Sequence, residues 1–218
     1  MRFLSSAVGA LLALAPLTPA SAQRYSGTPS EPLTLTLETA PDARGVVQRT
    51  TVAIRADGSR AEATEFVKPG EAPGLERASR HVWDLSTGQS VGVYPAQRTK
   101  ITLALDELGR GRPAPTPSCA DAAGPMRLVE QSTETILGYT VVKVSDAARV
   151  EEWRAPELGC LPLRRRLRSG SRELREQAVA IELGQPDAAL YAIPADYQEQ
   201  ADALRAERAT VFSWRRER

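Results

Sequence analysis

The sequence predicts a mainly β protein: an antiparallel meander that forms a curved half-barrel and is followed by a C-terminal helix. Apolar and polar residues alternate with a period of two along most of the chain, as they do on strands with one buried face. Short segments rich in Gly, Ser and Asp separate these runs without helical patterns between them, so consecutive strands are expected to pair antiparallel. About ten strands with a single helix leave an apolar sheet face that must be covered by curvature, a second layer or a ligand.

Residues 1–22 have the order of a secretory signal peptide. Arg2 supplies a positive start, Phe3–Leu17 is an uncharged, mostly apolar run, and the small residues at 20–22 form a cleavage site. The apolar run is too short to span a bilayer comfortably, and no Cys follows the cleavage site to carry a lipid. We therefore expect an exported bacterial protein, periplasmic or secreted, without a membrane span after cleavage.

The rest of the chain is expected to hold one domain. Residues 23–32 are polar and contain Pro, Gly and Ser, which is typical of a flexible leader. Residues 33–212 form a single β-rich domain, and residues 213–218 form a basic tail. Removing 22 residues from 218 leaves 196, which is enough for one sizeable core.

Strands are expected to follow one another from Leu33 onward. The dipeptide Asp57-Gly58 is a strong hairpin signal, since Gly accepts a positive φ. Residues 106–125 contain several Gly and Pro and are expected to be a loop. The helix is expected at Gln198–Phe212, which is rich in Ala, Glu, Gln and Arg. The expected strand segments are 33–37, 51–55, 60–67, 81–85, 90–94, 101–105, 126–136, 139–144, 150–154, 161–168 and 173–183.

Cys119 and Cys160 are the two cysteines of the chain. In an exported protein, a single pair is most simply a structural disulfide. Neither cysteine lies in a CxxC motif or near a histidine, which disfavours the alternative of a reactive or metal-binding pair. A Cys119–Cys160 disulfide would close a loop of about 40 residues and stabilise the fold by about 4 kcal/mol.

One motif suggests an enzyme. Residues 88–92 (GQSVG) match the G-x-S-x-G nucleophile elbow, which needs a strand-to-helix turn and a histidine later in the chain. Here the motif lies in a predicted hairpin, and the only histidine, His81, precedes Ser90. The sequence contains no H-E-x-x-H motif, clustered His and Cys, or EF-hand loop. We therefore predict a protein that is not an enzyme and that holds no metal or cofactor.

The charge balance gives no reason to expect nucleic acid as a partner. The formal net charge is +1, and it falls to about zero once Arg2 is removed. The arginines at 164, 165, 166 and 168 are interpreted as an exposed strand face, with an anion-binding site as the alternative.

Five short segments resemble a group of exported bacterial proteins. They are residues 138–143 (GYTVVK), 153–160 (WRAPELGC), 186–197 (ending YAIPADY), 56–59 (ADGS) and 94–98 (YPAQR). Together they resemble the LolA-like outer-membrane lipoprotein carriers and their relatives of unknown function. The resemblance implies an unclosed antiparallel β-barrel with a helix at its mouth, which in some members binds acyl chains.

The expected function is non-catalytic binding of a lipid, another apolar ligand or a lipidated partner such as a lipoprotein. The alternative is a cell-envelope interaction or sensor module in which a sheet edge or loop binds another protein, and an enzyme of unidentified type comes third. A carrier requires an apolar cavity, whereas an interaction module requires a filled core with an exposed edge. The residues expected to line the apolar face are Leu35, Leu37, Val52, Ile54, Trp83, Leu103 and Trp153.

Overall fold

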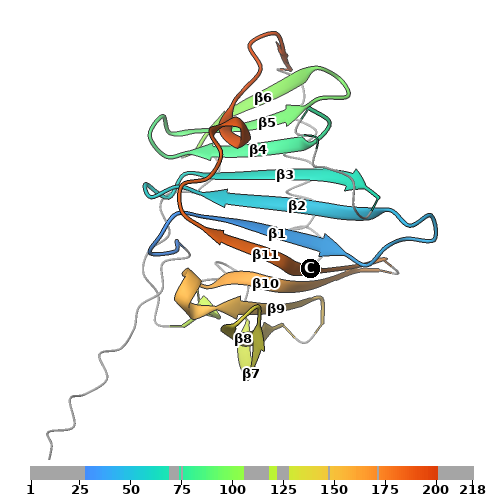
Figure 1. Cartoon of the computed structure of the whole chain (residues 1–218), viewed down its shortest axis with the longest axis vertical. Helices are drawn as coiled ribbons and strands as arrows, with labels where there is room; N and C mark the ends of the chain where they lie inside the picture. The colour runs from blue at the N-terminus through green and yellow to red at the C-terminus, as the bar shows by residue number, and fades with distance from the viewer. Residues whose placement is uncertain are drawn as a thin grey trace, which may run out of the picture.

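The structure is a computed structural model that describes residues 28–68, 74, 76–105, 118–121, 128–146, 148–170 and 172–200. These residues form a single sheet of 12 strands in the order β12-β6-β5-β4-β3-β2-β1-β11-β10-β9-β8-β7 (Figure 1). Two meanders, β1–β6 and β7–β11, are joined where the first strand of one pairs with the last strand of the other. All neighbouring strands are antiparallel except β12 and β6.

The predicted mainly β architecture is therefore confirmed, and the elements lie close to the expected segments. They are β1 (Leu33–Thr39), β2 (Val47–Ile54), β3 (Arg60–Val67), β4 (Ser79–Asp84), β5 (Gln89–Tyr94), β6 (Thr99–Ala104), β7 (Val129–Ile136), β8 (Tyr139–Ser145), β9 (Val150–Ala155), η2 (Pro156–Leu158), β10 (Leu161–Ser169), β11 (Arg172–Leu183), η3 (Ala188–Tyr191) and β12 (Gln198–Glu199), where η marks a 3-10 helix.

The hairpin predicted at Asp57-Gly58 joins β2 to β3. Gly58 has a φ of 87°, a conformation that favours glycine. The carboxylate of Asp57 accepts hydrogen bonds from the backbone N and the Oγ of Ser59, at 2.8 and 3.0 Å. The dipeptide therefore sets the turn and, with it, the pairing of β2 with β3.

The prediction of a helix beginning at Gln198 is wrong. Gln198 and Glu199 form β12, which pairs parallel with Thr99 and Lys100 of β6. The carboxylate of Glu199 also accepts hydrogen bonds from the backbone N and the Oγ1 of Thr102, at 2.7 and 3.1 Å. The open edge of β6 offers unpaired backbone groups, and pairing with them outweighs the helix propensity of these two residues. The remainder of the predicted helix, residues 201–212, lies outside the described residues.

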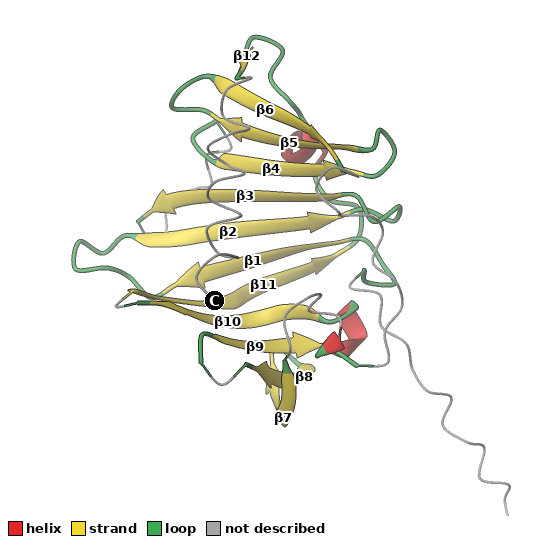
Figure 2. Cartoon of the chain, turned by 180° about the vertical axis from the view of Figure 1, so that it is seen from behind, coloured by secondary structure: helices red, strands yellow, loops and turns green. Residues whose placement is uncertain are grey.

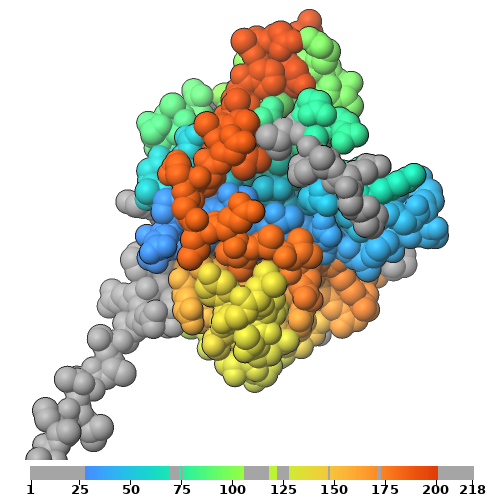
Figure 3. Space-filling model, in the orientation of Figure 1, coloured from blue at the N-terminus to red at the C-terminus, as the bar shows by residue number. Residues whose placement is uncertain are grey.

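The segment that follows β11 covers one side of the sheet. We call this side the alanine face. Small residues of β2 and β3, with Val82 of β4, pack there against Leu190 of η3. The segment containing η3 crosses this side in the space-filling view (Figure 3). Because η3 lies in front of the sheet in Figure 1 and behind it in Figure 2, Figure 2 shows the opposite side. The described ranges contain no helix long and apolar enough to cross a membrane.

The structure joins Cys119 and Cys160 in a disulfide with a Cα–Cα distance of 5.3 Å. Both cysteines are buried in a small cluster with Leu128 and Val144. The bond ties the segment 118–121 to the start of β10, beside the β7–β8 hairpin. A disulfide is consistent with an oxidising location outside the cytoplasm. The predicted signal peptide and the basic tail lie outside the described residues.

Candidate functional site: the leucine face

The side of the sheet opposite the alanine face carries a continuous apolar strip. Cross-strand pairing places residues of β1 beside residues of β2 on this side, which we call the leucine face. The strip residues are 0–3% exposed and belong to one core cluster, which also includes residues of η2 and of strands β7 to β11. The leucine strip consists of Leu33, Leu35, Leu37, Val52 and Ile54.

The sequence prediction of the lining residues holds for six of the seven. Four of them belong to the leucine strip. Trp83 and Leu103 lie on the same face, because both are direct cross-strand neighbours of Ser90 and continue the row that begins at Leu33 and Ile54. Trp153 is different: it only borders the cluster, and the cations of Lys143 and Arg164 lie 5.2 and 5.0 Å from its ring centroid.

Polar side chains of β3, β4 and β5 border the leucine strip, and the ring of Trp83 lies among them. We call this region the margin. The margin consists of Arg60, Glu62, His81, Trp83 and Ser90. Arg60 forms an ion pair with Glu62. His81 Nε2 lies 2.8 Å from Ser90 Oγ, and its ring stacks on Trp83 with centroids 4.3 Å apart and planes 5° apart. The register of three neighbouring strands thus brings two charges and two aromatic rings beside an apolar surface.

A second charged pair enters the same face from the other meander. Arg165 of β10 forms an ion pair with Glu176 of β11, whose side chain is only 2% exposed. Burial raises the pKa of Glu62, but the positive charges of Arg60 and Arg165 outweigh this effect, and its pKa is lowered. Arg165 therefore acts electrostatically on Glu62 across the three strands that separate β10 from β3.

Arg60 and Arg165 on the leucine face each have a hydrogen-bond donor without a partner within the described ranges. The side chains of Arg60 and Arg165 are 30% and 20% exposed, so water reaches them, whereas the leucine strip is covered. Their Nε atoms are buried and find no hydrogen-bond partner within the described ranges. A buried donor without a partner costs free energy, and it becomes available to an added anion only where the side chain moves to expose it.

The candidate nucleophile of the GQSVG motif does not form an accessible site. Ser90 lies within β5 rather than on a strand-to-helix turn, and it is 1% exposed. The structure does bring it to His81, which the order of the two residues in the sequence did not suggest. The signal was the β4–β5 hairpin, whose register pairs Ser90 with Trp83 and places His81 diagonally next to it. In the part of the chain that the structure describes, no group of three His, Cys, Asp or Glu residues could hold a metal.

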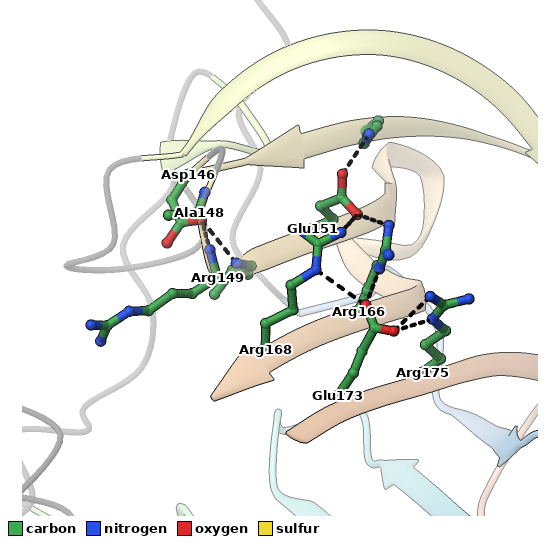
Figure 4. A network of polar contacts seen from close by, with 10 residues as sticks. Asp146, Ala148, Arg149, Glu151, Arg166, Arg168, Glu173 and Arg175 are labelled. Carbon is green, nitrogen blue, oxygen red and sulfur yellow. Dashed lines mark hydrogen bonds and ion pairs between the residues drawn. The ribbon is translucent and has the colours of Figure 1, made fainter. Parts of the chain in front are cut away.

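The predicted arginine face divides between the two sides of the sheet. Arg165 is directed to the leucine face, whereas Arg166 and Arg168 project from the other side of β10 and share the carboxylates of Glu151 and Glu173 (Figure 4). Lys143 and Arg175 complete this charged lattice, at 2.9 Å from Glu151 and 2.6 Å from Glu173. The arginines are thus neutralised largely by glutamates of adjacent strands, as expected for an exposed strand face.

The charged lattice predicts a pH dependence of stability. Hydrogen bonds from Arg166, Arg175 and Arg168 lower the pKa of Glu173 from 4.5 to about 2. Because the folded pKa is depressed, this carboxylate contributes stability above pH 4.5, and the contribution is lost as the pH falls towards 2. We expect Glu173→Gln to be less stable than the wild type at pH 6 and to approach it at pH 2, in urea unfolding at both values. A stability difference that does not change between the two pH values would contradict this assignment.

The sequence matches no known protein-family model, and no curated protein matches it. Among solved structures, the chain is similar to MucB in the MucA/MucB complex of Pseudomonas aeruginosa, with 16% identity and a TM-score of 0.46 over 80% of this chain and 60% of that chain. A second MucB structure gives 15% identity and a TM-score of 0.42 over 80% and 62% of the two chains. PNGF-II gives 13% identity and a TM-score of 0.37 over 81% and 33%. The chain therefore spans less than two thirds of either protein.

Proposed function

We propose that this protein is an exported, non-catalytic binding protein for an anionic amphiphile, such as a fatty acid or a phospholipid. The acyl chain enters beside Trp83 at the margin and continues towards the leucine strip of a half-barrel, and the anionic head lies at Arg60 and Arg165. The proposal rests on the adjacency of a continuous buried apolar strip to two partly exposed arginine side chains, whose buried Nε atoms have no hydrogen-bond partner within the described ranges.

The two parts of the site would contribute differently to binding. Each methylene of the ligand that is buried against apolar side chains contributes about 0.8 kcal/mol. The arginines orient the ligand and select a carboxylate or phosphate head, since a guanidinium can donate two parallel hydrogen bonds to either. The leucine strip already packs against its neighbours. The acyl chain of the ligand therefore enters at the margin, where Trp83 is only partly buried and lies beside Arg60.

Native mass spectrometry of the oxidised protein from an exporting host, followed by organic extraction, tests the proposal. We expect a bound anionic lipid in the wild type and a several-fold lower occupancy in Arg60→Gln. This substitution removes the charge of Arg60 and its ion pair with Glu62, whose side chain is 27% exposed in the wild type. Arg44→Gln is the matched control, since Arg44 lies in the exposed turn before β2 and makes the same change of charge.

The two functions expected from the sequence give different results in this experiment. A lipid that is lost in Arg60→Gln but kept in Arg44→Gln supports the carrier. A lipid-free protein, or equal lipid in both variants, contradicts it. A lipid-free protein that carries a polypeptide instead supports the alternative, an interaction module of the cell envelope.

A further inference from the structure

Three ion pairs between arginine and glutamate lie on the leucine face, and their charges cancel. Two of them are the pairs of the margin and of β10 with β11 described above. The third joins Arg154 and Glu152 of β9, which are both buried. Glu152 is the direct cross-strand neighbour of Arg165, and Arg165 is the direct neighbour of Glu176, so the second and third pairs form one row across β9, β10 and β11. An anion added to these three pairs therefore leaves one negative charge in excess.

Glu176 is the carboxylate that depends most on Arg165. Its side chain is 2% exposed, and Arg165 is its ion-pair partner. Its Oε1 lies in this ion pair but receives no well-oriented hydrogen bond from the residues that the structure describes. Its direct neighbour on β1 is Thr39, which carries no charge. If Arg165 turns towards an added anion, the buried carboxylate of Glu176 loses its counter-charge, which is costly.

The other two carboxylates of the face stay stabilised when Arg165 moves. Glu152 accepts a hydrogen bond from the Nε of Arg154 at 2.8 Å, and this contact does not involve Arg165. The side chain of Glu62 is 27% exposed, so water solvates its carboxylate. Glu176 is therefore the group that must compensate when an anion takes Arg165 from it.

We propose that binding of an anionic head at Arg165 is coupled to the uptake of one proton by Glu176. This inference rests on the proposed function and adds the regulation of its site. The guanidinium of Arg165 turns from Glu176 to the head, and Glu176 takes one proton from the solvent, because a buried carboxylate without a counter-charge becomes neutral rather than staying ionised. The charge of the face is then unchanged, since one negative charge arrives with the head and the proton cancels another.

The coupling makes the affinity for the ligand depend on pH. The complex holds one proton more than the free protein, so a lower pH favours the complex and a higher pH favours the free protein. For a head that stays ionised, we expect the dissociation constant to rise by up to about tenfold for each unit by which the pH increases. The protein would then hold its ligand in acidic surroundings and release it as the pH rises.

Isothermal titration calorimetry of the full mature chain near neutral pH tests the coupling. The ligand is dihexanoylphosphatidylglycerol below its micellar concentration, because its phosphodiester stays ionised in this range. The binding heats in two buffers of different ionisation enthalpy give the number of protons taken up. We expect about one proton per ligand in the wild type and none in Glu176→Gln. Glu182→Gln is the matched control, since Glu182 is exposed on the other side of the same strand, and it should keep the proton uptake.

Each outcome decides between the coupling and the proposed function. Binding without proton uptake in the wild type would overturn the coupling and leave the proposed function intact. Uptake that persists in Glu176→Gln would place the proton on another group, such as His81 beside Glu62, and would also overturn the coupling. A wild type that does not bind the ligand at any pH would contradict the proposed function itself, and the coupling with it. The wild-type heats alone show whether a proton is taken up, so this part of the test does not depend on the folding of a variant.

Discussion

Replacing Cys119 and Cys160 together with serine is expected to lower the free energy of unfolding by about 4 kcal/mol. The disulfide closes a loop with a sequence separation of 41, so its removal restores chain entropy to the unfolded state. The native state gains nothing in return, since both positions are 1% exposed in an apolar cluster and burying serine hydroxyls there costs free energy. Urea unfolding of the oxidised wild type and of the double variant measures the difference.

A reducing agent provides the control for this prediction. Dithiothreitol should destabilise the wild type by a similar amount and leave the double-serine variant unchanged. A difference of less than about 1 kcal/mol between the oxidised wild type and the variant would show that the loop around Cys119 does not constrain the unfolded chain. An effect of dithiothreitol on the variant would show that the reagent acts by another route.

Leu35→Ala is expected to lower the free energy of unfolding by about 3 kcal/mol, within the range for buried leucines. Leu35 is 2% exposed at the centre of the leucine strip, between Val52 of β2 and Ile181 of β11. Truncation removes buried methyl groups and leaves a cavity that the flanking strands cannot close without losing their register. Urea unfolding of the two proteins measures the effect.

Leu183→Ala is the matched control, since Leu183 lies on the neighbouring strand β11 but is 54% exposed. The control should change the stability by no more than about 0.5 kcal/mol, as is usual for a surface site. If Leu35→Ala were as mild as Leu183→Ala, the leucine strip would not be part of the stable core.

The strands could be predicted because the alternation of apolar and polar residues within each strand shows which side chains are buried. Leucines alternate with polar residues in β1, and the structure buries Leu33, Leu35 and Leu37 while their neighbours are partly exposed. The helix prediction failed at Gln198 because propensity is a local property, whereas the edge of β6 that captures Gln198 and Glu199 lies about a hundred residues earlier in the chain.

The site could be predicted only in its apolar half. Period-two patterning identifies inward-facing leucines, but it does not show which polar residues share their face once strands pair. His81 and Ser90 could have been brought together from the register of one short hairpin. The effect of the Arg165 charge on the pKa of Glu62 could not, because it depends on the pairing of β1 with β11, which joins the two meanders. Likewise, the period of two along a strand places Arg165 on one side of the sheet and Arg164 and Arg166 on the other. It does not show which of the two sides is buried.

Photolabelling is the most direct test of whether the leucine face binds the acyl chain of an anionic amphiphile. The probe is a long-chain fatty acid with a diazirine near the end of its chain, and peptide mass spectrometry locates the attached label. We expect labelling in β1, β2, β4 and β6, around the leucine strip, Trp83 and Leu103, and we expect it to fall several-fold in Arg60→Gln but not in Arg44→Gln. Labelling confined to exposed apolar residues such as Phe66 and Val179, or equal labelling in both variants, would contradict acyl-chain binding at the leucine face.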